Sequence, residues 1–173
     1  MRGLPLFFIM ILQVDSRQQA GKHKAKHDYF ESLGIKLVVS KMLVGDYCIP
    51  SDGSVVVDTK KDMLELYTDI ISQHERFRNE CMLAQEADIK LYVLVENTNG
   101  IKTLKDVGTE KWKNPLWFKY FKTKKGKPPA KNVTLMKMLY TMQEKYGVEF
   151  VFCTPEDAGK KVLKLLGVKE KKE

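Results

Sequence analysis

Residues 44–60 read VGDYCIPSDGSVVVDTK, and this stretch decides the fold. Two strand-forming runs, Leu43 to Ile49 and Ser54 to Asp58, flank a turn built from Pro, Ser, Asp and Gly. The pattern predicts an antiparallel hairpin, in which the start of the first strand lies beside the end of the second. We therefore expect Asp46, near the start of the first strand, to meet Asp58 at the end of the second.

The residues around Asp58 favour a metal-dependent hydrolytic site. Because side chains alternate along a strand, Asp58 and Lys60 share one face, whereas Thr59 faces away and offers its main-chain carbonyl. Mg²⁺ or Mn²⁺ takes oxygen ligands from carboxylates, carbonyls and water, so Asp46, Asp58 and Thr59 are the candidate metal ligands. A cation held there would activate water and stabilise charge on a phosphate. Lys60 would hold that water or the phosphate, so Asp46, Asp58 and Lys60 are the candidate catalytic residues.

Two further residues belong to the same edge of the expected sheet. Asp15 follows the first predicted strand and is a candidate accessory acid, and Arg17 suits a phosphate oxygen. An isolated Asp at a hairpin mouth is commonly a plain turn residue. Asp58 and Lys60 differ from that case because they directly follow Val55 to Val57, a run expected to be buried.

The remaining chain predicts an α/β fold, with a mixed central sheet flanked by helices in one domain, residues 1–173. Apolar residues recur at helical spacing in four segments, and short apolar runs predict further strands. The expected helices are Gln18–Leu33, Lys61–Gln85, Val133–Tyr146 and Pro155–Leu166, and the further strands are Phe8–Val14, Ile35–Val39, Ile89–Val95 and Val148–Phe152.

The composition of the chain indicates the kind of partner it binds and the compartment in which it is found. Thirty Lys and Arg against 22 Asp and Glu give a formal net charge of +8, which favours a polyanion such as DNA. Three widely spaced cysteines indicate reduced thiols in a cytoplasmic protein. The apolar run Leu4–Val14 is too short to span a membrane. His23 and His27 have a zinc-like spacing, but lysines surround them, so a solvated basic face is the preferred interpretation.

A basic, aromatic-rich excursion covers about residues 98–130. Aromatic rings can stack on unpaired bases while lysines follow the backbone, which makes the segment a candidate DNA-binding element. The alternative is a packing flap whose aromatics complete the core, and the sequence weights the two about equally. The candidate contacts are Trp112, Lys113, Lys122, Lys124 and Lys125.

The hairpin with Asp46, Asp58 and Lys60, together with the segment Asp15–Arg17 that follows the first strand, resembles the nuclease domain of XPF-type structure-specific endonucleases of the PD-(D/E)xK superfamily. The family has a Gly-Asp strand, then Glu-Arg-Lys at the end of the next strand and a long helix that carries Arg-Leu-x-x-Gln, near which Arg76 lies here. The likeness covers most of the chain outside about residues 98–130. It implies a restriction-endonuclease-like core, Mg²⁺- or Mn²⁺-dependent phosphodiester cleavage, and a support or DNA-contact role for Arg76. Arg78 is a further candidate DNA contact. Asp58 stands for the family's Glu and Thr59 for its Arg.

The resulting hypothesis is a DNA endonuclease that acts on branched, flap or otherwise structured DNA in a bacterial or phage-infected cell. The chain length resembles small stand-alone phage or prophage members, and the resemblance implies a homodimer through the two C-terminal helices. A non-catalytic DNA-binding scaffold with a nuclease-like core is the alternative, and an RNA-processing nuclease is a third, weaker option.

Overall fold

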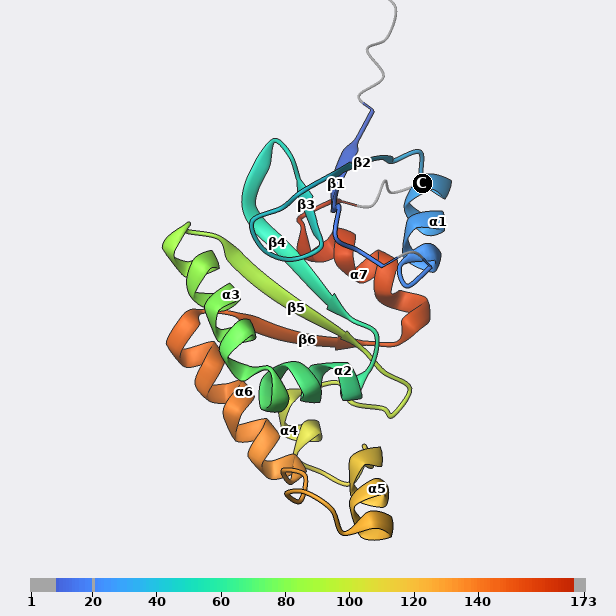
Figure 1. Cartoon of the computed structure of the whole chain (residues 1–173). Coiled ribbons are helices and arrows are strands. Elements are labelled where there is room, and N and C mark those ends of the chain that lie inside the picture. Colours follow the sequence, from blue (N-terminus) through green and yellow to red (C-terminus); the bar gives the residue numbers. More distant parts are fainter. Residues whose placement is uncertain (1–8, 20, 170–173) are drawn as a thin grey trace, which may run out of the picture.

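The computed structural model, which describes residues 9–19 and 21–169, contains a mixed six-stranded sheet in the order β2-β1-β3-β4-β5-β6 (Figure 1). β1 pairs in parallel with β2 and antiparallel with β3, β3 and β4 are antiparallel, and β4, β5 and β6 are parallel. The strands are β1 (Ile11–Asp15), β2 (Lys36–Ser40), β3 (Tyr47–Ile49), β4 (Asp52–Lys60), β5 (Lys90–Glu96) and β6 (Glu149–Cys153).

Helices cover both faces of this sheet (Figure 1). One face packs against α1 (Lys24–Ser32) and α7 (Ala158–Leu165), through a core that includes Phe30 and Val162. The other face packs against α2 (Met63–Tyr67), α3 (His74–Glu86), α4 (Leu104–Val107) and α6 (Asn132–Tyr146). Two faces of buried apolar residues explain why the central strands have near-continuous apolar sequences. The α/β prediction with a mixed central sheet is confirmed.

The predicted hairpin is confirmed, although its first strand is shorter than expected. Tyr47 pairs with Val57 and Cys48 with Val56, and an irregularity follows before the turn. The predicted strand from Leu43 does not form, because Gly45 has a φ of +69°, which interrupts extended backbone.

The predicted single helix over Lys61–Gln85 is wrong. α2 ends at Tyr67, a π-helical segment η1 (Thr68–Ser72) follows, and α3 begins at His74. The wider π-turn shifts the register, so that Asp69 of η1 and Phe77 of α3 are both buried. Such single π-turns often occur at functional sites.

Three other expectations need correction. The first helix begins at Lys24 instead of Gln18, and the excursion contains α4 and α5 (Pro115–Thr123). The last predicted helix begins with a 3₁₀ turn, η2 (Pro155–Asp157). Phe8, the predicted start of the first strand, lies outside the described residues.

His23 does not lie on a solvated basic face. It is 4% exposed, and its Nδ1 is 2.9 Å from the hydroxyl of Tyr47, which also contacts His27. Burial, together with the charges of Lys26 and Lys22, lowers the pKa of His23 to about 4. The buried Lys26 instead pairs with Glu96, so this side of α1 is a packed polar layer. Within the described chain, no helix has the length and apolar character to cross a membrane.

Candidate active site

Asp58, Thr59 and Lys60 end β4 inside the sheet. β4 lies between β3 and β5, and all three side chains are buried. Val56 belongs to the core on the α2–α3 face, so alternation directs Asp58 and Lys60 toward that same face. This is the shared orientation that the sequence predicts.

Asp46 lies across from Asp58 at the open end of the hairpin. Its N–H donates to the carbonyl of Val57 at 2.9 Å, and it stands one residue beyond the Tyr47–Val57 pair. Asp46 Oδ2 accepts hydrogen bonds from Thr59 N at 2.8 Å and Thr59 Oγ1 at 2.6 Å. The Thr59 side chain therefore does not face away from the site as expected; it holds the Asp46 carboxylate in place.

Lys60 lies between two buried carboxylates and an aromatic ring. Its Nζ is 2.8 Å from Asp58 Oδ2 and 2.6 Å from Asp69 Oδ2, and 5.3 Å from the ring centroid of Phe77. Burial alone would lower the pKa of Lys60, but the charges of Asp58 and Asp69 outweigh it and raise the pKa. Lys60 is therefore a fixed cation at neutral pH.

Sequence reasoning missed two acids of this site, Asp69 and Glu80. Asp69 pairs with Lys60, and Glu80 Oε1 accepts a hydrogen bond from Gly45 N at 3.0 Å. The signal was their spacing: Asp69 is three residues after Leu66, and the half-buried Glu80 lies three after Phe77, beside the buried stripe of α3. An acid on a buried helical face is rarely accidental, because an unpaired buried charge is costly.

Burial and neighbouring negative charges disfavour the ionised forms of the acids in this site. Burial raises the pKa of Asp58 to about 6, with Lys60 opposing and the Asp46 charge adding to the rise. Burial also raises the pKa of Asp46 and of Glu80, and for Glu80 the nearby charge of Asp58 adds to the effect. A bound cation would favour the ionised forms of these groups.

The donor set fits a sparsely ligated divalent ion. Asp58 Oδ2 is buried with no hydrogen-bond partner among the described residues, although it forms an ion pair with Lys60. In residues 9–19 and 21–169, no three His, Cys, Asp or Glu side chains form a metal-binding group by themselves. Mg²⁺ is usually held by only one or two carboxylates plus water and substrate oxygens. Asp46 and Asp58 satisfy that requirement.

Asp15 and Arg17 brace the edge of the site. Asp15 accepts hydrogen bonds from Arg17 Nε at 2.8 Å and from Met42 N at 2.9 Å, and its own N–H donates to the Asp46 carbonyl. Burial alone would raise the pKa of Asp15, but these hydrogen bonds and the Arg17 charge outweigh it and lower the pKa. The Asp15 carboxylate thus orders the end of β1 and the start of β3, beside Asp46.

The two arginines of α3 are placed differently from each other. Arg76 is 73% exposed at its side chain, and its Nη2 is 3.6 Å from Asp69. It therefore extends from the Lys60 cluster toward solvent, where a phosphate could reach it. Arg78 has a buried Nε with no hydrogen-bond partner among the described residues.

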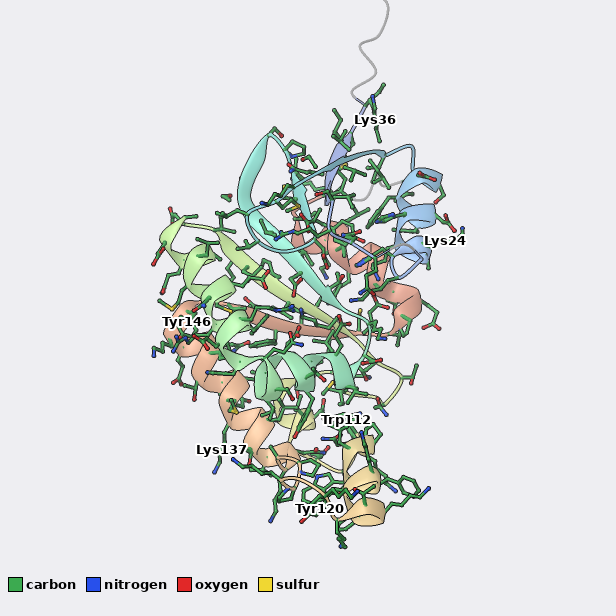
Figure 2. The ribbon with its side chains drawn as sticks, viewed as in Figure 1. Lys24, Lys36, Trp112, Tyr120, Lys137 and Tyr146 are labelled. Atoms are coloured by element: carbon green, nitrogen blue, oxygen red, sulfur yellow. The ribbon has the colours of Figure 1, made fainter. Side chains whose placement is uncertain are left out.

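The predicted DNA contacts of the excursion differ in burial: one anchors the segment to the core, and the others lie on the surface. Trp112 is 6% exposed, and its ring centroid is 5.9 Å from that of Tyr67, so it belongs to the core and not to a stacking surface. The other predicted DNA contacts in this segment, Lys113, Lys122, Lys124 and Lys125, are exposed. Figure 2 shows Trp112 between α5 and the rest of the domain, with Tyr120 farther out.

The fold and the family are both recognisable by comparison. A family model described as the ERCC4 domain matches residues 14–166. The fold is similar to that of XPF from Aeropyrum pernix, with a TM-score of 0.58 and 15% identity over 90% of this chain. The structure of XPF from Aeropyrum pernix in complex with DNA gives the same TM-score and identity over 92% of this chain. This chain spans 63% and 64% of those two chains. No curated protein sequence matches.

Proposed function

Because the chain belongs to the ERCC4 domain family, we propose that it is a divalent-metal-dependent endonuclease that hydrolyses phosphodiester bonds in branched, flap or otherwise structured DNA. The observation that carries this proposal is the buried Asp58 carboxylate, which lies across the hairpin from Asp46 and whose Oδ2 is paired with Lys60 and accepts no other hydrogen bond from the described residues. The formal charge of +8 supports a polyanionic substrate.

The proposed metal ligands are Asp46 and Asp58, with the Thr59 carbonyl as a candidate third donor. A bound Mg²⁺ or Mn²⁺ supplies a water of lowered pKa and positive charge at the phosphate. The protein's part is to fix the two carboxylates. Thr59 does this for Asp46 through two hydrogen bonds, and burial between neighbouring strands does it for Asp58.

Lys60 is proposed to hold the attacking water or a phosphate oxygen. An ammonium group has three donors, and two of them are directed to Asp58 and Asp69. One donor remains for a reacting oxygen. Because the two acids also keep Lys60 charged, its positive charge is available without reorganisation when negative charge develops on the phosphate.

The test compares wild type, Asp58→Ala and Asp52→Ala on labelled flap, branched and duplex DNA with Mn²⁺ or EDTA. Asp52 is a matched control because it begins the same strand but is exposed at the opposite end. We expect nicking by wild type and Asp52→Ala, no nicking in EDTA, and a loss of at least about a hundred-fold in Asp58→Ala. Equal cleavage by wild type and Asp58→Ala would contradict the proposed site.

The alternative is a non-catalytic DNA-binding scaffold. The departures Asp58 and Thr59 from the XPF-type pattern favour it. A Mn²⁺ titration of the same variants separates the two functions, since a ligand that binds only the native state raises the Tm. The endonuclease predicts a rise in wild type that disappears in Asp58→Ala, whereas a scaffold that has lost its metal site predicts no rise in either.

A further inference from the structure

α5 exposes aromatic side chains that the proposed chemistry does not use. None of its residues is buried, and Phe118 and Phe121 are 75% and 58% exposed. Trp117 and Tyr120 complete the aromatic group, which we call the α5 platform (Trp117, Phe118, Tyr120 and Phe121). Isolated apolar residues are common on protein surfaces, but a contiguous group of aromatic rings marks an interaction site.

Three rings of the platform, those of Trp117, Tyr120 and Phe121, contact one another, and Phe118 adds an exposed ring on the same helix. The Trp117 and Phe121 rings are stacked, with centroids 5.4 Å apart and planes at 29°, and Tyr120 meets Trp117 edge-on at 6.0 Å. Lys124 Nζ lies 4.8 Å from the ring centroid of Phe121. A preformed arrangement lowers the entropy lost on binding.

Both ends of the surrounding segment are anchored to α2. Trp112 packs on Tyr67, and Ala130 N donates to the Tyr67 hydroxyl at 2.7 Å. The Asn132 side chain closes the segment by donating to the carbonyls of Thr109 and Trp112, each at 2.8 Å. α2 begins three residues after Lys60. The platform is therefore held on the element that directly follows the candidate active site (Figure 1).

Charge indicates what the platform binds. Residues 109–131 contain eight lysines and one acid, Glu110. Flat aromatic surfaces among lysines suit a polyanion that offers exposed flat faces, which unpaired nucleotides do and paired duplex bases do not. We propose that the α5 platform binds a single-stranded DNA segment by stacking its bases on Phe118 and Phe121. The choice of DNA, and of a segment near the cleaved bond, rests on the proposed function.

The test separates base stacking from apolar and purely ionic binding. A fluorescent oligothymidylate and an abasic oligomer of equal charge are titrated by anisotropy in EDTA, so that no cleavage is needed. Phe118→Leu with Phe121→Leu keeps apolar area but removes the rings, whereas Phe118→Tyr with Phe121→Tyr keeps the rings. Tyr140→Ala is the matched control, because Tyr140 is an exposed aromatic residue on α6. Circular dichroism checks that each variant is folded.

We expect the Leu variant to bind oligothymidylate roughly five- to hundred-fold more weakly than wild type. The Tyr variant and Tyr140→Ala should bind like wild type, and the abasic oligomer should bind all four proteins weakly. Unchanged binding by the Leu variant would overturn the proposal and favour a protein partner for the apolar surface. Equal affinity for the abasic oligomer would also overturn it, and tighter binding of oligouridylate would overturn the assignment to DNA. Because Asp58→Ala should keep this binding, failed cleavage and failed stacking are distinguishable.

Discussion

Gly45 holds the backbone conformation on which Asp46 depends. Its φ is +69°, and a Cβ at this position would lie 2.4 Å from Val56 Cγ1 and 3.3 Å from the Val57 carbonyl oxygen. Its N–H donates to Glu80. A side chain here would separate the two hairpin strands at the point where Asp46 meets Asp58, so the glycine is required both for its φ and for close approach.

Gly45→Ala is expected to lower the free energy of unfolding by about 2–4 kcal/mol, since it adds overpacking to the cost of the left-handed conformation. Gly147→Ala separates the two effects. Gly147 has a φ of +68° but open space around its Cβ position, so about 1–2 kcal/mol is expected there. Urea unfolding measures both changes. Equal losses of unfolding free energy in the two variants would show that Val56 moves aside at little cost.

At the scale of elements, η1 determines how Lys60 is held. The π-turn places Asp69 in the core, where it forms the shorter of the two ion pairs of Lys60. An uninterrupted α-helix from Met63 to Glu86 would give Asp69 and Phe77 a different relative orientation, because the two turns differ in residues per turn. η1 therefore connects α2, which follows the site, to α3, which carries Glu80.

Asp69→Asn is expected to reduce the rate of cleavage roughly ten- to hundred-fold, as loss of a supporting partner commonly does. The removed charge raises the pKa of Lys60 in wild type, so in the variant that pKa falls. Any alkaline loss of activity should therefore begin at a lower pH in the variant than in wild type. DNA affinity in EDTA should not fall, because Asp69 is buried and the exposed Arg76 only loses its ion pair with it. Activity that matches wild type over the whole pH range would refute a positioning role.

The limits of sequence reasoning follow from the same elements. Strand alternation and a turn signal identify the hairpin and place Asp58 and Lys60 on one face, because these depend on neighbours in sequence. The π-helical segment Thr68–Ser72 could not be predicted, because the apolar periodicity of the sequence continues through it. Local spacing also cannot tell that the aromatic ring of Trp112 packs on Tyr67, 45 positions earlier, whereas Phe118 stays exposed. Such contacts exist only after the chain has folded.

At the scale of the whole molecule, only some of the basic residues are available to bind DNA. Lys26 is buried in an ion pair with Glu96, and Lys60 belongs to the candidate active site. By contrast, Lys122, Lys124 and Lys125 are exposed at the end of α5. Figure 2 shows Lys36 at the opposite end of the molecule from Tyr120. If DNA lies along α5, the salt dependence of binding should come from lysines at that end and not from the net charge.

Replacement of Lys122, Lys124 and Lys125 by Gln tests this distribution. Each lysine that neutralises a phosphate contributes about 0.7–0.9 to the slope of log K against log salt, because bound counterions are released. The triple variant should therefore lower the magnitude of the slope by about 2–3, with weaker binding at every salt concentration. A control with Lys36, Lys41 and Lys164 changed to Gln removes the same charge from other exposed positions, and its slope should match wild type. Equal slope changes in the two triple variants would mean that net charge, and not the α5 end, governs the electrostatic attraction to DNA.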